Sequence, residues 1–179
     1  AAAETVRLEE VQADRVIALL EKYQEQSHLL DKHLELLVTR IMDAVKAVIR
    51  LRETDREAER QAAQDNQAAS FPFQVYCNPG LQLVFKILYT LCKVRGYKAV
   101  VKQLPHQVAD LEPCLHLLQC QDAADYTTWE TRYSLLLWMS MLVLIPFDLD
   151  TVDSSLAANA AADNHSAGSL VQTTVELCK

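Results

Sequence analysis

The stretch NPGLQLVFKILYTLCKVRGYKAVVKQLP, residues 78–105, decides the fold class. Asn78 and Pro79 predict a helix start, because Asn is a favourable cap and Pro at the first helical position lacks only an amide that would be unpaired there. Apolar residues then recur at helical spacing on two faces, which indicates a helix covered on two sides, as in the middle of a helical array. One face holds Leu81, Phe85, Leu88 and Cys92, and the other holds Val84, Ile87, Leu91 and Val94.

A corner is predicted at Gly96. Lys93 and Arg95 precede it in the last helical turn, where cations complement the partial negative charge of a helix end. Glycine can adopt the left-handed backbone that closes a helix. Beyond Gly96, apolar residues three and four apart predict a short second helix that ends at Pro105, so the local unit is helix, tight corner, helix.

Other segments also carry helical signals. Residues 14–25 and 31–49 have their apolar residues on one face, and Asp31 is the expected N-cap of the second segment. Pro113 predicts the first turn of a short helix that ends near Cys120.

Thr127 and Glu130 have capping-box spacing and predict the start of a further helix, which Pro146 stops. This helix has two apolar sides. One side holds Trp129, Tyr133, Leu136, Leu137 and Leu144, and the other holds Leu135, Trp138, Met139 and Leu142.

The composition supports a helical domain. The chain has 179 residues, of which 50% are hydrophobic, and only 3 Gly and 5 Pro argue against an all-β protein with its many turns. None of the predicted helices can bury its apolar face alone, so consecutive helices must pack together. The predicted fold class is all-α, a HEAT- or armadillo-like helical array (an α-solenoid fragment), with an irregular helical bundle as the alternative.

The same signals divide the chain into four segments. They are an N-terminal helical pair (1–50), a polar linker or solvated helix extension (51–77), a helical-repeat core (78–150) and a flexible C-terminal segment (151–179). Propensity alone does not choose between the two alternatives for the second segment.

The charge is unevenly distributed. The formal net charge is −7, which gives the chain no general attraction to nucleic acid or anionic membranes. Residues 71–109 nevertheless contain no Asp or Glu, so this stretch is cationic although the chain as a whole is acidic. Its basic residues, called here the basic island, are Lys86, Lys93, Arg95, Lys98 and Lys102.

Cysteine usage and hydropathy indicate a cytoplasmic protein that does not insert into a membrane. Five Cys, an odd number without a tight spacing pattern, are typical of reduced thiols. The longest apolar run, residues 133–147, has about 15 residues where a membrane span needs roughly 20.

The sequence predicts no catalytic, cofactor or metal site. His116 and Cys120 stand four apart but lack a second pair of ligands for zinc. Asp148, Asp150 and Asp153 lack the remaining pattern of a calcium loop. With three glycines scattered over the chain, a phosphate-binding loop is also excluded.

The basic island has two interpretations. It is either a solvated polar corner between packed helices or a docking surface for an acidic protein; nucleic acid fits poorly, because interleaved stacking aromatics are missing. On the second interpretation, the predicted protein-binding residues are Lys93, Arg95, Tyr97, Lys98 and Lys102.

Three segments resemble the N-terminal region of the tubulin-folding cofactor D family. They are EKYQEQSHLLDKHLE (21–35), FKILYTLCKVRGYKAVVKQLPHQVADLEP (85–113) and WETRYSLLLWMSMLVLIPFDL (129–149). Because members of that family are several times longer, we expect this chain to be a fragment or a truncated form.

The resemblance implies a cytoplasmic, cytoskeleton-associated α-solenoid of HEAT-like repeats that binds β-tubulin. It implies action with tubulin-folding cofactors E and C and an Arf-like small GTPase in assembly and disassembly of the α/β-tubulin heterodimer. It also implies a share in stimulating GTP hydrolysis by tubulin, as part of that complex. Tubulin is acidic, which suits the basic island.

Two other functions remain open at this point. One is a generic armadillo- or HEAT-type adaptor that binds a different protein or GTPase. The other is a fragment of a metal-dependent enzyme, which would need a metal site that the sequence does not indicate.

Overall fold

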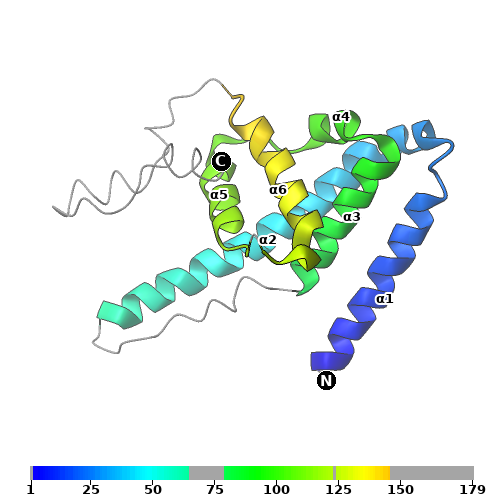
Figure 1. Cartoon of the computed structure of the whole chain (residues 1–179). Helices are drawn as coiled ribbons and strands as arrows, with labels where there is room; N and C mark the ends of the chain where they lie inside the picture. Colours follow the sequence, from blue (N-terminus) through cyan, green and yellow to red (C-terminus); the bar gives the residue numbers. More distant parts are fainter. Residues whose placement is uncertain (1, 65–78, 123, 146–179) are drawn as a thin grey trace.

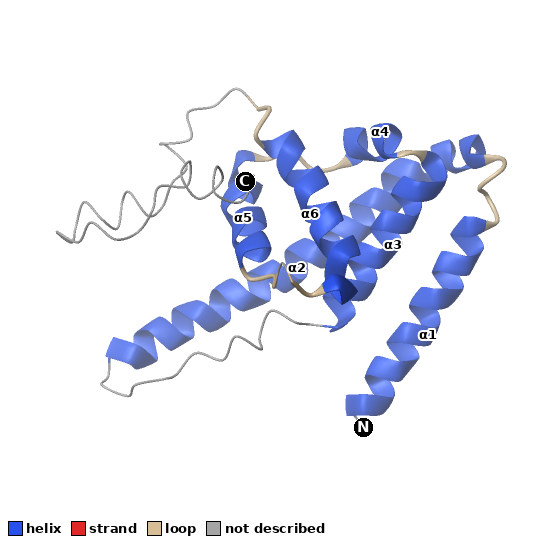
Figure 2. Cartoon of the chain, in the orientation of Figure 1, coloured by secondary structure: helices blue, strands red, loops and turns tan. Residues whose placement is uncertain are grey.

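A computed structural model describes residues 2–64, 79–122 and 124–145, and all regular secondary structure in these ranges is helical (Figures 1 and 2). The α-helices are α1 (Ala2–Glu21), α2 (Asp31–Gln64), α3 (Pro79–Arg95), α4 (Tyr97–Val100), α5 (Leu111–Gln119) and α6 (Trp129–Leu142). Short 3-10 helices precede or follow them: η1 (Ser27–Leu30), η3 (Val101–Gln103), η4 (Val108–Asp110) and η5 (Tyr126–Thr128).

Helix α3 is the centre of the array. It packs against α1, α2, α4 and α6, while α5 packs against α6 (Figure 1). The two apolar faces predicted for this helix explain the arrangement, because each face is covered by a different neighbour. Phe85 and Leu91 are 0% exposed and Leu88 is 1% exposed, so the sequence identified the core of this segment correctly.

The buried core extends from α2 through α3 to α6. Its largest fully buried side chains are Trp138, Phe85, Leu88, Leu91, Leu104, Leu111, Leu118, Leu135, Leu142, Val38, Val45 and Val100. Trp138 also donates its indole N–H to the carbonyl oxygen of Pro105 at 2.8 Å. This bond fixes α6 against the segment that follows the predicted corner.

The corner itself has the predicted backbone. Gly96 has a φ of 95°, a value that favours glycine, and its amide donates to the Cys92 carbonyl at 2.9 Å. A partly buried ion pair joins α2 to η4, with Lys46 Nζ 2.7 Å from Asp110 Oδ2.

Two predicted helix caps are wrong. Asp31 has helical backbone angles, and its carboxylate accepts hydrogen bonds from Arg95 rather than from the first-turn amides. Thr127 does not cap α6. Asp125 instead accepts from the Thr127 amide at 2.9 Å, because a 3-10 turn, η5, precedes the α-helix.

The helical boundaries also differ from the expected ones. α1 begins at Ala2 rather than near residue 14, and α2 continues to Gln64, so residues 51–64 are helical. The expected helix start at Asn78 and the C-terminal segment 151–179 lie outside the described residues. The division into four segments stays a prediction.

Only one of the two apolar sides of α6 is buried. Leu135, Trp138 and Leu142 are at most 1% exposed, whereas Trp129 is 47% exposed and Leu136 is 41% exposed. The helix therefore packs on α3 and α5 through one side and presents the other outward.

Candidate protein-docking surface

Two cations of the basic island pair with acidic residues of α1. Lys86 Nζ lies 3.6 Å from Asp14 Oδ1, and Lys93 Nζ lies 3.0 Å from Glu21 Oε1. Both partners of each pair are about half exposed or more. These two cations therefore already have acidic partners within the chain.

Arg95 pairs with Asp31 at the start of α2. Arg95 Nη2 donates to Asp31 Oδ2 at 2.9 Å, and Arg95 Nε donates to the other carboxylate oxygen. Such a two-point contact is stronger than a single charged hydrogen bond. The hydrogen bond to Arg95 lowers the pKa of Asp31, and the same bond raises the pKa of Arg95.

The remaining predicted residues lie on α4 and η3. Tyr97 is 48% exposed, and Lys98 and Lys102 are exposed as well. Within the described residues neither lysine forms an ion pair. Of the predicted protein-binding set, these three side chains are the ones that the fold leaves available to a partner.

An aromatic cluster on α3 and α6 was missed by sequence reasoning. The Tyr89 ring packs edge-on against Trp129, with centroids 4.6 Å apart, and against Tyr133, with centroids 5.3 Å apart. Burial raises the pKa of Tyr133, with smaller contributions from Cys92, Tyr89 and Tyr97.

Trp129 and Tyr133 were assigned to one apolar side of a helix, but only the packing shows that this side stays partly exposed. Tyr and Trp are enriched in protein interfaces, since they offer large contact areas at small entropic cost. The aromatic cluster (Tyr89, Trp129, Tyr133) with Tyr97 therefore widens the candidate surface beyond the basic residues.

The described residues contain no group of three or more His, Cys, Asp or Glu that could hold a metal ion. His116 and Cys120 do meet, with Nδ1 and Sγ 3.3 Å apart. His106 Nδ1 lies instead 3.2 Å from the Leu104 carbonyl. The aspartates at 148, 150 and 153 lie outside the described ranges.

Two buried thiols are poor nucleophiles. Burial raises the pKa of Cys92 to about 12, and burial, with Asp110 nearby, raises the pKa of Cys114 still further. Burial therefore disfavours the thiolate form of both side chains, which is the reactive form of cysteine.

In the part of the chain that the structure describes, no helix has both the length and the hydropathy of a membrane span.

These features define a helical-repeat protein of the armadillo kind, with a mixed aromatic and basic surface. The family model for "Tubulin-specific chaperone D-like, ARM repeat" matches residues 20–179, so the chain belongs to this family. The predicted fold class and the resemblance seen in the sequence are thereby confirmed.

Two curated relatives carry matching names. A tubulin-folding cofactor D of Schizosaccharomyces pombe is 40% identical over 70 residues, which cover 39% of this chain and 6% of the relative. A tubulin-specific chaperone D of Dictyostelium discoideum is 23% identical over 200 residues, which cover 79% of this chain and 13% of the relative. The chain thus spans a small part of the length of these relatives. No solved structure matches it.

Proposed function

We propose that this chain is part of a non-enzymatic helical scaffold of a tubulin chaperone. The observation that carries the proposal is the family match over residues 20–179. The names of the two relatives support it, since one is named a tubulin-folding cofactor and the other a tubulin-specific chaperone. A helical array suits such a role because stacked helices leave a long surface free to contact a client.

The proposed client is β-tubulin, bound by charge and shape complementarity. Exposed Lys98 and Lys102 supply positive charge, and Tyr97 supplies an aromatic contact beside them. Lys93 and Arg95 remain in the proposed surface, although each already has an acidic partner within the chain. The positive electrostatic potential of this surface would steer an acidic client toward it.

The wider proposal includes further partners. The scaffold acts with tubulin-folding cofactors E and C and an Arf-like small GTPase in assembly and disassembly of the α/β-tubulin heterodimer, in the cytoplasm and at the cytoskeleton. Stimulation of GTP hydrolysis by tubulin is assigned to the complex, and this chain contributes a binding surface to it.

The decisive experiment reverses the charge of two exposed lysines, Lys98 and Lys102. We expect the double substitution Lys98→Glu and Lys102→Glu to weaken capture of β-tubulin about tenfold or more, because attraction becomes repulsion at two positions of one surface. The circular dichroism spectrum should be unchanged, since both side chains are exposed and outside the ion pairs.

A matched control changes the same charge elsewhere. Arg40 and Arg50 are exposed residues of α2 that form no ion pair in the described residues and do not belong to the proposed surface. Arg40→Glu with Arg50→Glu should therefore leave capture within about twofold of the parent. Equal binding by both double variants would remove Lys98 and Lys102 from the mechanism.

A proteome-wide pull-down with the whole chain tests the function itself. Enrichment of tubulin and its folding cofactors supports the chaperone role. Enrichment of an unrelated protein or GTPase, with no tubulin, would favour the general armadillo adaptor instead.

A further inference from the structure

Helix α1 is attached to the array differently from the other long helices. Of its described side chains only Ala13 and Leu20 are buried, while Val16 is 42% exposed and Leu19 is 55% exposed. It also lies almost wholly outside the family match, which begins at residue 20. α1 therefore packs along α3 and leaves most of its described side chains exposed.

The ion pairs between α1 and α3 are in register. Asp14 and Glu21 are seven residues apart, as are Lys86 and Lys93, so each helix presents its charges two turns apart. The pairs occur in the same order along both helices, which makes α1 and α3 parallel (Figure 1). α1 thus shows which ligand this face of α3 accepts: a helix with carboxylates at heptad spacing.

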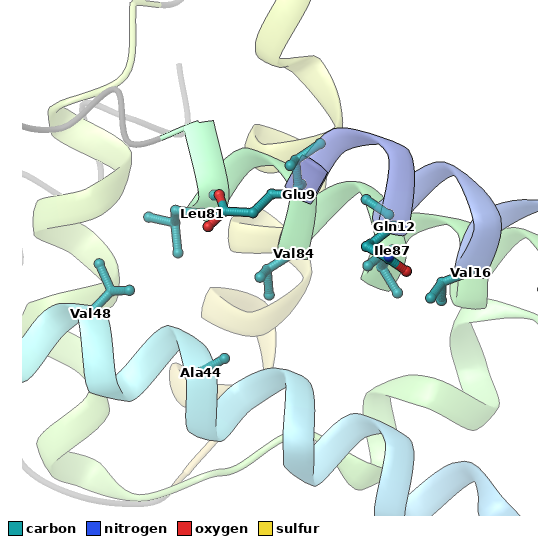
Figure 3. A pocket seen from close by; sticks show the side chains of 11 residues that line it. Glu9, Gln12, Val16, Ala44, Val48, Leu81, Val84 and Ile87 are labelled. Atoms are coloured by element: carbon teal, nitrogen blue, oxygen red, sulfur yellow. The ribbon is translucent and has the colours of Figure 1, made fainter. Parts of the chain in front are cut away.

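The fit of α1 is incomplete. An apolar groove of about 600 Å³ lies between α1 and α2, with the first turns of α3 contributing to its wall (Figure 3). Val16 reaches it from α1, Ala44 and Val48 from α2, and Val84 and Ile87 from α3. A helix with a broader apolar stripe than α1 would fill this groove while keeping the same ion pairs.

We propose that the α2–α3 face under α1 is a docking site for an acidic amphipathic helix of a partner, and that α1 is a displaceable internal occupant. Charge complementarity defines the occupant, because Lys86 and Lys93 pair with carboxylates and the largely apolar groove favours apolar side chains. Such a docking site goes beyond the proposed tubulin scaffold, and it does not involve Lys98 or Lys102, the lysines whose substitution tests that scaffold.

A labelled peptide tests the site in the full chain. The probe is a fluorescein-labelled synthetic peptide of residues 2–24, measured by fluorescence anisotropy. Substituting Asp14→Lys and Glu21→Lys should release the tethered α1 and tighten probe binding about tenfold, because the competing occupant is lost. A probe that carries the same two substitutions is the control and should not bind. Equal binding of the acidic probe to parent and variant chains would overturn the proposal.

Three further variants distinguish loss of the docking site from loss of folding. Adding Lys86→Glu and Lys93→Glu to the released variant restores opposite charges, so α1 should regain protection from hydrogen exchange and binding of the acidic probe should disappear. In the released variant, Ala44→Glu should weaken the probe about tenfold by placing a like charge in the groove. Thr39→Glu, on the same helix but outside the groove lining, should have no such effect.

Hydrogen exchange on the parent chain gives a direct readout. Amides of α1 should exchange at least about a hundredfold faster than those of α3, as expected of a locally opening segment. Equal protection of the two helices would overturn displacement. A parent dimer with exchanged α1 helices, seen by sedimentation, would make a second copy the occupant and also overturn the proposal.

Discussion

Helices α1 and α3 lie side by side, but α3 has two apolar faces where α1 has one, and the fold buries them to different depths. α3 is enclosed, with Phe85 and Leu91 fully buried, whereas among the described side chains of α1 few are buried and Val16 and Leu19 are largely exposed. The comparison teaches that the number of apolar faces, and not helical periodicity alone, indicates how deeply a helix is buried. Depth depends on how many neighbours the array brings to each face.

The largest expected effect lies in the core around α3. Trp138 is 1% exposed and donates to the Pro105 carbonyl, so Trp138→Ala removes a large side chain and leaves that carbonyl unpaired. We expect a loss of about 3–5 kcal/mol in the free energy of unfolding, measured with urea. Leu19→Ala on α1 should change the free energy of unfolding by no more than about 0.5 kcal/mol. Equal losses in the two variants would contradict the difference in burial between α1 and the core.

The corner after α3 should show a smaller effect. At Gly96 an added Cβ would meet no atom within 4 Å, so Gly96→Ala introduces backbone strain without a clash. The expected cost is about 1–2 kcal/mol, because L-residues other than Gly rarely adopt a φ of this sign. A urea midpoint equal to that of the parent would mean that the corner relaxes to a negative φ.

The ion pair between α3 and the start of α2 predicts a dependence on pH. The pKa of Asp31 is lowered below its ordinary 3.8 by Arg95, so the folded state favours the charged carboxylate. Its stabilisation is present above pH 3.8 and is lost as the pH falls through the lower pKa of the folded state.

The measurement is the melting temperature of parent and Asp31→Asn chains between pH 7 and pH 2. The parent should be more stable at neutral pH, and the two curves should converge in acid. A constant separation at all pH values would show that the Arg95 contact does not depend on the charge of Asp31.

The smallest effect is expected where α1 meets α3. Asp14 is 69% exposed, so Asp14→Asn should change the free energy of unfolding by no more than about 0.5 kcal/mol, and less in high salt. A loss comparable with that at Gly96 would show that α1 is an integral part of the array. Urea unfolding at two salt concentrations separates these results.

Much of the fold could be predicted because local signals were strong. Pro79 begins α3, Gly96 has the expected positive φ, and the short helix with Pro113 in its first turn ends at Gln119, next to Cys120 as expected. The failed caps have a common cause. Asp31 and Thr127 are good capping residues, but both form other hydrogen bonds. The Asp31 carboxylate accepts from Arg95, and the Thr127 amide donates to Asp125 in the 3-10 helix η5.

The candidate surface was predicted less completely. The sequence located the basic island, but it did not indicate that Lys86, Lys93 and Arg95 would pair with acids 64–72 residues away. The sequence also places Trp129 on an apolar side of its helix, but it does not indicate that this residue stays half exposed beside Tyr89.

The sequence by itself determined that the chain is helical, where α3 turns at Gly96, and to which family the chain belongs. These properties depend on neighbouring residues, through backbone preference and the periodicity of apolar side chains. Only the tertiary structure decided which side of α6 is buried, which cations are already paired, and that α1 leaves a groove. Each of these depends on contacts between residues far apart in the chain, and local periodicity carries no information about such partners.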